Sequence, residues 1–276
     1  MHTRLRKGWT LMHTRISRIG VFDSGIGGLT VLKCLLDLVP GVDMIYLGDT
    51  ARLPYGTKSP RTIIRYSVQC ARFLASMDID MLVVACNTAS AHAVPALKEE
   101  FHIPVVGVVE AGASAAIEAG GTRIGVIGTS STVKSHAYEE TIRSLKPEVE
   151  IIARACPLFV PLVEEGWYDD EITAQVASRY LKDLVEARID TLLLGCTHYP
   201  LLKEVLAGIM GSGVTIVDSA LSTARVVQNL IKPGTGRDEE RRVSFHLSDS
   251  SPRFIELGEH FLGREMKYVY DVDLCV

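Results

Sequence analysis

The most constraining feature of this chain is an internal repeat of two strand-like segments. The tetrapeptide RIGV at 18–21 recurs at 123–126, and IDMLVVAC at 79–86 recurs as IDTLLLGC at 189–196. The two offsets, 105 and 110 residues, differ only by the length of a loop. Apolar strands can resemble one another by chance, but both copies of the longer segment end on a cysteine. The repeat therefore predicts two α/β halves built on one plan.

Short apolar runs alternate with segments of helical period along the whole chain. We expect buried strands at 19–22, 44–47, 81–85, 105–109, 124–127, 151–153, 191–194 and 214–217. Between two of them, Ser59 followed by Pro60 is typical of a helix start. The apolar residues spaced to form the buried stripe of that helix are Ile64, Val68, Ala71 and Ala75. This alternation predicts an α/β fold of mostly parallel sheets flanked by helices.

Composition narrows the possible partners and locations. The net charge of −4 indicates no overall basic surface that could bind nucleic acid. Hydrophobic residues make up 47%, as in average globular proteins. No apolar run approaches the roughly 18 residues that span a bilayer, and the N-terminus lacks the pattern of a secretory signal. The six cysteines are dispersed without a C-x-x-C pair. We therefore expect reduced thiols, a cytoplasmic location, and no membrane or nucleic-acid partner.

The two repeated cysteines are candidates for one shared site. Ligands of open parallel sheets bind beyond the carboxyl ends of the strands, and both cysteines are expected at such ends. If the halves are related by a pseudo-twofold axis, Cys86 and Cys196 point into one cleft from opposite sides. Each is followed by hydrogen-bonding side chains, at 87–88 and 197–198. A thiol whose pKa a helix N-terminus or a cation brings toward neutrality transfers protons well, so the pair suits acid/base chemistry on a small molecule.

Two other interpretations of these cysteines stay open. The first is that they are simple buried apolar residues, which is our interpretation of Cys34, Cys70 and Cys275. The second is a zinc site, because Cys86, Cys196 and His198 could supply three ligands. No C-x-x-C or H-x-x-H motif accompanies them, however. We therefore expect no metal.

The loop DSGIGG at 23–28 follows the first strand and precedes a helix that begins at Leu29. It is not a dinucleotide fingerprint, because G-x-G-x-x-G would require glycine where Thr30 stands. Its glycines let backbone N–H groups approach a ligand, and a helix N-terminus favours an anion. Asp23 would repel such an anion, so we expect it to act in acid/base chemistry or to bind an amine. A turn or capping role is the alternative.

Taken together, five segments carry a family resemblance. They are DSGIGG at 23–28, PYG at 54–56, CNTAS at 86–90, PLVE at 161–164 and CTHYPLL at 196–202. In this order they closely resemble the bacterial glutamate racemases, cofactor-independent members of the aspartate/glutamate racemase superfamily. The resemblance extends from Ile19 to about Gly263. It implies a first α/β domain of residues 18–111 plus 222–276 and a second of residues 112–221, with residues 1–17 as a tail.

The resemblance also implies a reaction and the residues that perform it. L-glutamate and D-glutamate would be interconverted without a cofactor, to supply D-glutamate for peptidoglycan, cell-wall biogenesis and cell shape. Cys86 would act on D-glutamate with help from Asp23, and Cys196 on L-glutamate with help from Glu164 and His198. The implied substrate-binding residues are Asp23, Ser24, Pro54, Tyr55, Gly56, Cys86, Asn87, Thr88, Thr129, Cys196, Thr197 and His198. A homodimer is expected on the same ground.

Two alternatives to this function remain at the level of sequence. An aspartate or hydantoin racemase would use the same two thiols on another substrate. A two-domain amino-acid sensor could keep the fold without the chemistry, although a protein that only binds has no need of two thiols.

The segment before the first strand yields a prediction. MHTR at 1–4 recurs at 12–15, so Met12 is an alternative start, and residues 1–17 lack a periodic apolar face. A segment that buries little apolar surface should dock only loosely. We expect deletion of residues 1–11 to change melting temperature and turnover little. A clear loss of either would show instead that Trp9, Leu11 and the nearby basic residues pack on the body.

Overall fold

The computed structural model describes residues 16–231 and 241–274, so most of the expected tail and Cys275 lie outside the described residues. Two positions of that tail are described. Ile16 is buried in the main core cluster, and the backbone N–H and hydroxyl of Ser17 both donate to Asp80, at 2.7 and 2.9 Å. These two residues therefore pack with the first sheet, and only the segment before them is outside the description.

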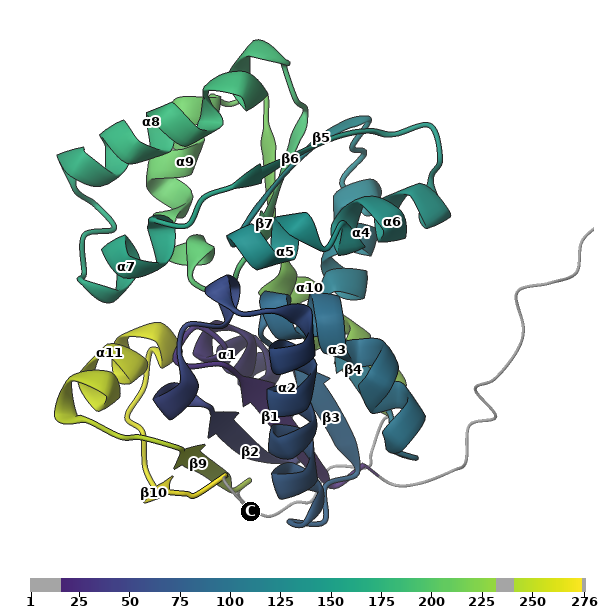
Figure 1. Cartoon of the computed structure of the whole chain (residues 1–276), viewed down its shortest axis with the longest axis vertical. Helices are drawn as coiled ribbons and strands as arrows, with labels where there is room; N and C mark the ends of the chain where they lie inside the picture. The colour runs from purple at the N-terminus through teal and green to yellow at the C-terminus, as the bar shows by residue number, and fades with distance from the viewer. Residues whose placement is uncertain (1–15, 232–240, 275–276) are drawn as a thin grey trace, which may run out of the picture.

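The chain forms two lobes, each built on one sheet (Figure 1). The first sheet has the strand order β10-β9-β2-β1-β3-β4 and the second has the order β6-β5-β7-β8. The first comprises β1 (Arg18–Asp23), β2 (Asp43–Gly48), β3 (Met81–Val84), β4 (Val105–Gly107), β9 (Val243–Leu247) and β10 (Val269–Asp271). The second comprises β5 (Arg123–Gly128), β6 (Glu150–Ala155), β7 (Thr191–Gly195) and β8 (Thr215–Asp218). All pairings among the described strands are parallel, which confirms the predicted α/β fold.

Helices cover both faces of each sheet. One face of the first sheet packs on α1 (Leu29–Leu38), α10 (Ser219–Leu230) and α11 (Pro252–Leu262), and the other on α2 (Pro60–Ala75) and α3 (Asn87–Glu100). The second sheet lies between α4 (Val108–Glu118) with α6 (Ala137–Leu145) and α8 (Glu171–Glu186) with α9 (Lys203–Met210). Shorter helical segments are α5 (Ser130–Lys134), α7 (Phe159–Glu164), η1 (Thr50–Arg52), η2 (Tyr55–Thr57) and η3 (Tyr199–Leu202). Successive strand residues alternate between the two covers: Val21 joins the core of α1, and Phe22 that of α2.

The sequence repeat corresponds to repeated contacts. The run β2-β1-β3-β4 matches β6-β5-β7-β8, so the two RIGV segments occupy equivalent strands. In the first lobe Asp80 accepts a hydrogen bond from the backbone N–H of Arg18 at 2.9 Å, and in the second Asp190 accepts one from Arg123 at 2.9 Å. The aspartate at the second position of each longer repeat therefore ties the start of one strand to the start of its neighbour.

The glycine of each RIGV segment serves close packing. A Cβ atom at Gly20 would lie 2.8 Å from Cδ1 of Ile79, and one at Gly125 would lie 2.5 Å from Cδ1 of Ile189. Each distance is shorter than a carbon–carbon contact. The isoleucine that begins the longer repeat thus fills the space over the glycine of the shorter one, so the two repeated motifs are parts of a single packing unit.

Two sequence predictions need correction. The run 105–109 is a strand only to Gly107, because that glycine caps α4 and Val108 is already helical. Helix α2 does begin after an N-cap at Ser59, whose hydroxyl accepts from the N–H of Thr62, but its buried line is Ile63, Ser67, Cys70, Ala71 and Leu74. Ala71 is the only residue of the predicted stripe that is fully buried. The buried line contains the polar residue Ser67. A search for regularly spaced apolar residues therefore selected a different face of the helix.

The chain passes from one lobe to the other through two neighbouring helices. Helix α4 follows β4 of the first sheet but packs on the second, and α10 leads back from β8 to lie against α1. The boundaries expected at 111/112 and 221/222 fall inside these helices and remain a prediction. None of the described helices is both long and apolar enough to cross a bilayer.

Candidate active site

One pocket, of about 360 Å³, lies where the carboxyl ends of strands from both lobes meet. Twelve of the predicted site residues line it: Ser24, Pro54, Tyr55, Gly56, Cys86, Asn87, Thr88, Thr129, Glu164, Cys196, Thr197 and His198. Asp23 lies behind the wall, fully buried. The structure thus brings together residues that are up to 174 positions apart in the sequence.

The remaining lining residues were missed by sequence reasoning. They are Leu53, Thr57, Ser130, Pro157, Val160 and Pro161. Most are apolar or small, and no residue type among them indicates chemistry. Their one sequence signal is position, because each lies inside a quoted motif or within four residues of a quoted motif or a predicted site residue.

Cys86 occupies the first half of the site. It follows β3 and caps α3, where its sulfur accepts from the backbone N–H of Ala89 at 3.4 Å and donates to Oγ of Ser24 at 3.4 Å. Burial raises the pKa of this thiol to about 12, and the charge of Asp23 adds to the rise. The hydrogen bonds with Ser24 and Ala89 act in the opposite direction but do not outweigh burial. In the absence of ligand, Cys86 is therefore protonated, contrary to the expectation that a helix N-terminus would bring its pKa toward neutrality.

Asp23 lies next to this half of the site but does not line the pocket. It ends β1, and its Oδ2 accepts from the backbone N–H of Gly25 at 2.8 Å, while no described residue hydrogen-bonds to its Oδ1. Burial raises the pKa of the carboxyl group, and the N–H of Gly25 and the charge of His198 only partly offset this. The side chain also packs on Gly28, where a Cβ atom would lie 2.4 Å from its own. Asp23 does not line the pocket, but its charge contributes to the raised pKa of Cys86.

Cys196 occupies the second half, directly after β7, in a different environment. The Nε2 atom of His198 lies 3.0 Å from Oε1 of Glu164, and the ring meets Phe261 edge-on at a centroid distance of 5.6 Å. Burial by itself lowers the pKa of His198, but hydrogen bonds and charges of Cys196 and Glu164 raise it to about 10. His198 can therefore hold a proton beside Cys196. No group of three potential metal ligands is arranged as a metal site anywhere in residues 16–231 or 241–274.

The glycine loop has a different role from the one expected. A Cβ atom at Gly27 would lie 2.2 Å from Oγ1 of Thr197 and 2.5 Å from Nδ1 of His198. Thr30 crosses to the same segment, because its hydroxyl donates to the carbonyl of Thr197 at 3.2 Å. The loop therefore lets the first lobe approach the second, and its glycines face protein side chains at this point.

The residues after Cys86 also bond across to the second lobe. The Oγ1 atom of Thr88 lies 2.9 Å from that of Thr129. The side-chain nitrogen of Asn87 donates to the hydroxyl of Tyr138 at 2.7 Å and to that of Ser219 at 3.2 Å. Both N–H directions of Asn87 are thus engaged with protein side chains.

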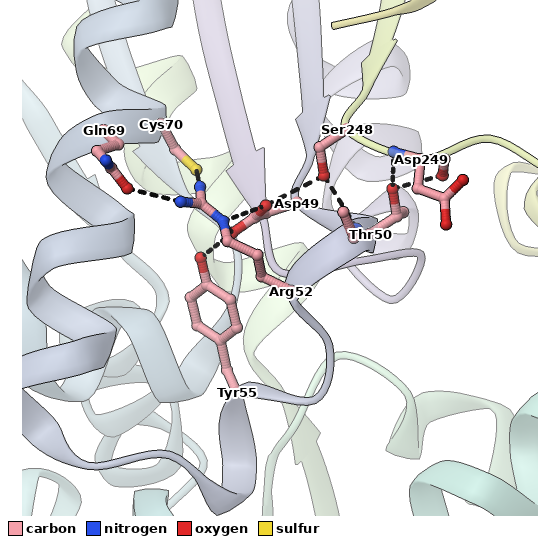
Figure 2. Close-up of polar contacts among 9 residues, drawn as sticks. Asp49, Thr50, Arg52, Tyr55, Gln69, Cys70, Ser248 and Asp249 are labelled. Carbon is pink, nitrogen blue, oxygen red and sulfur yellow. Dashed lines mark hydrogen bonds and ion pairs between the residues drawn. The ribbon is translucent and has the colours of Figure 1, made fainter. Parts of the chain in front are cut away.

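Tyr55 belongs to the wall but its hydroxyl does not face a ligand. It donates to the buried carboxylate of Asp49, on the side away from the second lobe (Figure 2). Beside it, Gly56 abuts Thr129, where a Cβ atom would lie 2.9 Å from the threonine Cβ. The 53–57 loop is therefore held between its own lobe and the opposite one.

These features are those of a two-domain α/β enzyme with its site between the domains. A glutamate racemase from Geobacter metallireducens is 52% identical over 261 residues, 93% of this chain and 96% of that protein. The glutamate racemase isoform RacE1 from Bacillus anthracis superposes with a TM-score of 0.90 at 37% identity, over 95% of this chain and 100% of its own. The glutamate racemase from Francisella tularensis, crystallised with D-glutamate, gives 0.88 at 37% identity, over 95% and 99%.

Residues 19–227 match the family of Asp/Glu/Hydantoin racemases. The chain belongs to this family, which confirms the superfamily that the motifs indicated.

The close contact at Gly27 can be tested through stability. Gly27→Ala should lower the free energy of unfolding by about 1–3 kcal/mol, because the added methyl group overpacks the contact with Thr197 and His198. Urea denaturation measures the change. Gly208→Ala is the matched control, since a Cβ atom there meets nothing within 4 Å and the site lies in α9. A Gly27→Ala protein as stable as the wild type would show that the two lobes do not meet at this loop.

Proposed function

We propose that this protein is a glutamate racemase in which Cys86 and Cys196 exchange the α-proton between the two faces of the substrate. The observation that carries the proposal is the presence of two buried thiols, from corresponding strand ends of the two lobes, on one pocket. The names of the relatives and of the solved neighbours support glutamate as substrate. Racemisation needs a base on one face and an acid on the other, and two opposed thiols meet that need.

In the L-to-D direction, the Cys196 thiolate takes the α-proton of L-glutamate and a planar carbanion forms. The Cys86 thiol then donates its proton to the opposite face, which gives D-glutamate. One C–H bond breaks and another forms, so no electrons are gained or lost. Each turnover leaves Cys86 as thiolate and Cys196 as thiol, which is the state that the reverse reaction requires.

The surroundings fit these two tasks. The raised pKa of Cys86, about 12, keeps the donor protonated before the reaction. His198 carries a proton next to Cys196, stabilises negative charge there, and is itself held by Glu164. Both cysteines are nearly inaccessible to solvent, and in a site that excludes water fixed charges and dipoles act more strongly on a developing carbanion.

The wider role is part of the same proposal. D-glutamate would be supplied for peptidoglycan and so for cell-wall biogenesis and cell shape, in the cytoplasm and by a homodimer. Residues 18–111 plus 222–276 and residues 112–221 would be the two domains that close around the substrate. The competing substrates are aspartate and hydantoins, since the matching family includes racemases of both.

The proposal is tested by circular dichroism of purified protein mixed with L-glutamate. We expect the signal to decay to zero as D-glutamate accumulates, and dialysis against a chelator to leave the rate unchanged. L-Aspartate in a parallel cell is the control for substrate class. Decay with L-aspartate alone would make the protein an aspartate racemase, stability of both signals would favour a sensor, and chelator sensitivity would revive the zinc hypothesis.

A second prediction concerns the thiols themselves. Cys86→Ser and Cys196→Ser should each lower kcat by at least about 100-fold, because either thiol alone lacks a partner on the far face. Cys34→Ser is the matched control, because this partly buried thiol lies in α1 and not on the pocket. Racemisation retained in either site variant would exclude the two-thiol mechanism.

A further inference from the structure

A buried carboxylate outside the reacting pair organises one wall of the pocket. Asp49 follows β2 and is completely inaccessible to solvent. Its oxygens accept from Nε of Arg52 at 2.8 and 2.7 Å, from the hydroxyl of Ser248 at 3.1 Å, and from the hydroxyl of Tyr55 (Figure 2). Arg52 and Tyr55 lie in the segment that follows Asp49, and Ser248 follows β9, so Asp49 joins two distant parts of the chain.

The network continues through Arg52 into helix α2. Its Nη1 donates to Oε1 of Gln69 at 2.6 Å and its Nη2 to the sulfur of Cys70 at 3.6 Å, both visible in Figure 2. The guanidinium also lies 4.2 Å from the ring centre of Tyr66. Arg52 is thus held by side chains of helix α2 on one side and hydrogen-bonded to Asp49 on the other. It therefore links the carboxylate to this helix.

The other end of the network reaches the pocket. Tyr55 is bound to Asp49 by its hydroxyl and is one of five consecutive wall residues, 53–57. The backbone of the same loop meets the second lobe, at the contact between Gly56 and Thr129. The position of the loop between the lobes therefore depends on the Tyr55–Asp49 hydrogen bond.

We propose that Asp49 is a positioning residue for substrate binding, acting through Tyr55 and Arg52 on the 53–57 loop. The inference rests on the proposed racemase function. Asp49 does not line the pocket and lies in neither cysteine half-site, so it has no part in proton transfer. Loss of its contacts loosens the wall and weakens substrate binding, while the thiols and their partners keep their geometry.

The test compares three variants in the racemisation assay. Tyr55→Phe removes one hydroxyl and keeps the ring, and we expect KM for L-glutamate to rise about tenfold with kcat within about twofold of wild type. Asp49→Asn removes the charge that faces Arg52 and should raise KM at least as much. Tyr66→Phe is the matched control. It removes a tyrosine hydroxyl that takes no part in the Asp49 network and keeps the ring that lies against the guanidinium of Arg52.

The outcomes separate the possibilities. A rise in KM for Tyr55→Phe, with kcat kept and Tyr66→Phe unchanged, supports the positioning role. General destabilisation would lower the apparent kcat, because less active protein remains, and would leave KM unchanged. This pattern would overturn the positioning role. An unchanged KM for Tyr55→Phe in an active enzyme, or an equal rise for Tyr66→Phe, would also overturn it, whether or not Asp49→Asn folds. If the wild type itself does not racemise glutamate, the proposed function falls first.

Discussion

The structure depends on the close approach of two sheets at the carboxyl ends of their strands. Each lobe alone would leave its strand-end groups in water, and only the opposed lobe buries them. The distance of approach is set by Gly27, which lies so close to Thr197 and His198 that no side chain fits between. Burial then follows for both cysteines, and burial is the largest cause of the raised pKa of Cys86. Packing between the lobes thus comes first, and the chemistry of the site is its consequence.

The two half-sites are equivalent in topology but differ in the ionisable side chains beside each cysteine. The repeated strands deliver a cysteine at the same place in each lobe, yet Cys86 has the carboxylate of Asp23 behind it while Cys196 has the imidazole of His198 beside it. The charge of Asp23 adds to the raised pKa of the Cys86 thiol, and the hydrogen bond and charge of Cys196 contribute to the raised pKa of His198. Under the proposed mechanism, these unequal neighbours would let the two thiols take different parts in one proton exchange.

Much of this could be predicted from the sequence, because the repeat indicates two halves built on one plan and the two cysteines mark corresponding strand ends. Twelve of thirteen predicted site residues line one pocket, but their roles remain predictions. What could not be predicted was the hydrogen-bond partner of individual side chains in the pocket wall. The hydroxyl of Tyr55 is turned to Asp49, and the nitrogen of Asn87 is engaged by Tyr138. No local pattern records such partners. No strand was predicted at β9 or β10, where the resemblance implied only that residues 222–276 complete the first domain.

After the second lobe the chain returns to the first, and side chains of this C-terminal segment contact both halves of the pocket. Ser248, directly after β9, hydrogen-bonds Asp49 and so supports the wall loop beside one half of the site. In α11, Arg253 pairs with Glu165 of the other lobe at 2.7 Å and reaches the carbonyl of Glu164, the residue that holds His198. Figure 1 shows α11 directly beneath α7, where these contacts form. Residues 241–274 therefore support both halves of the pocket, the wall loop through Ser248 and the Glu164 side through Arg253.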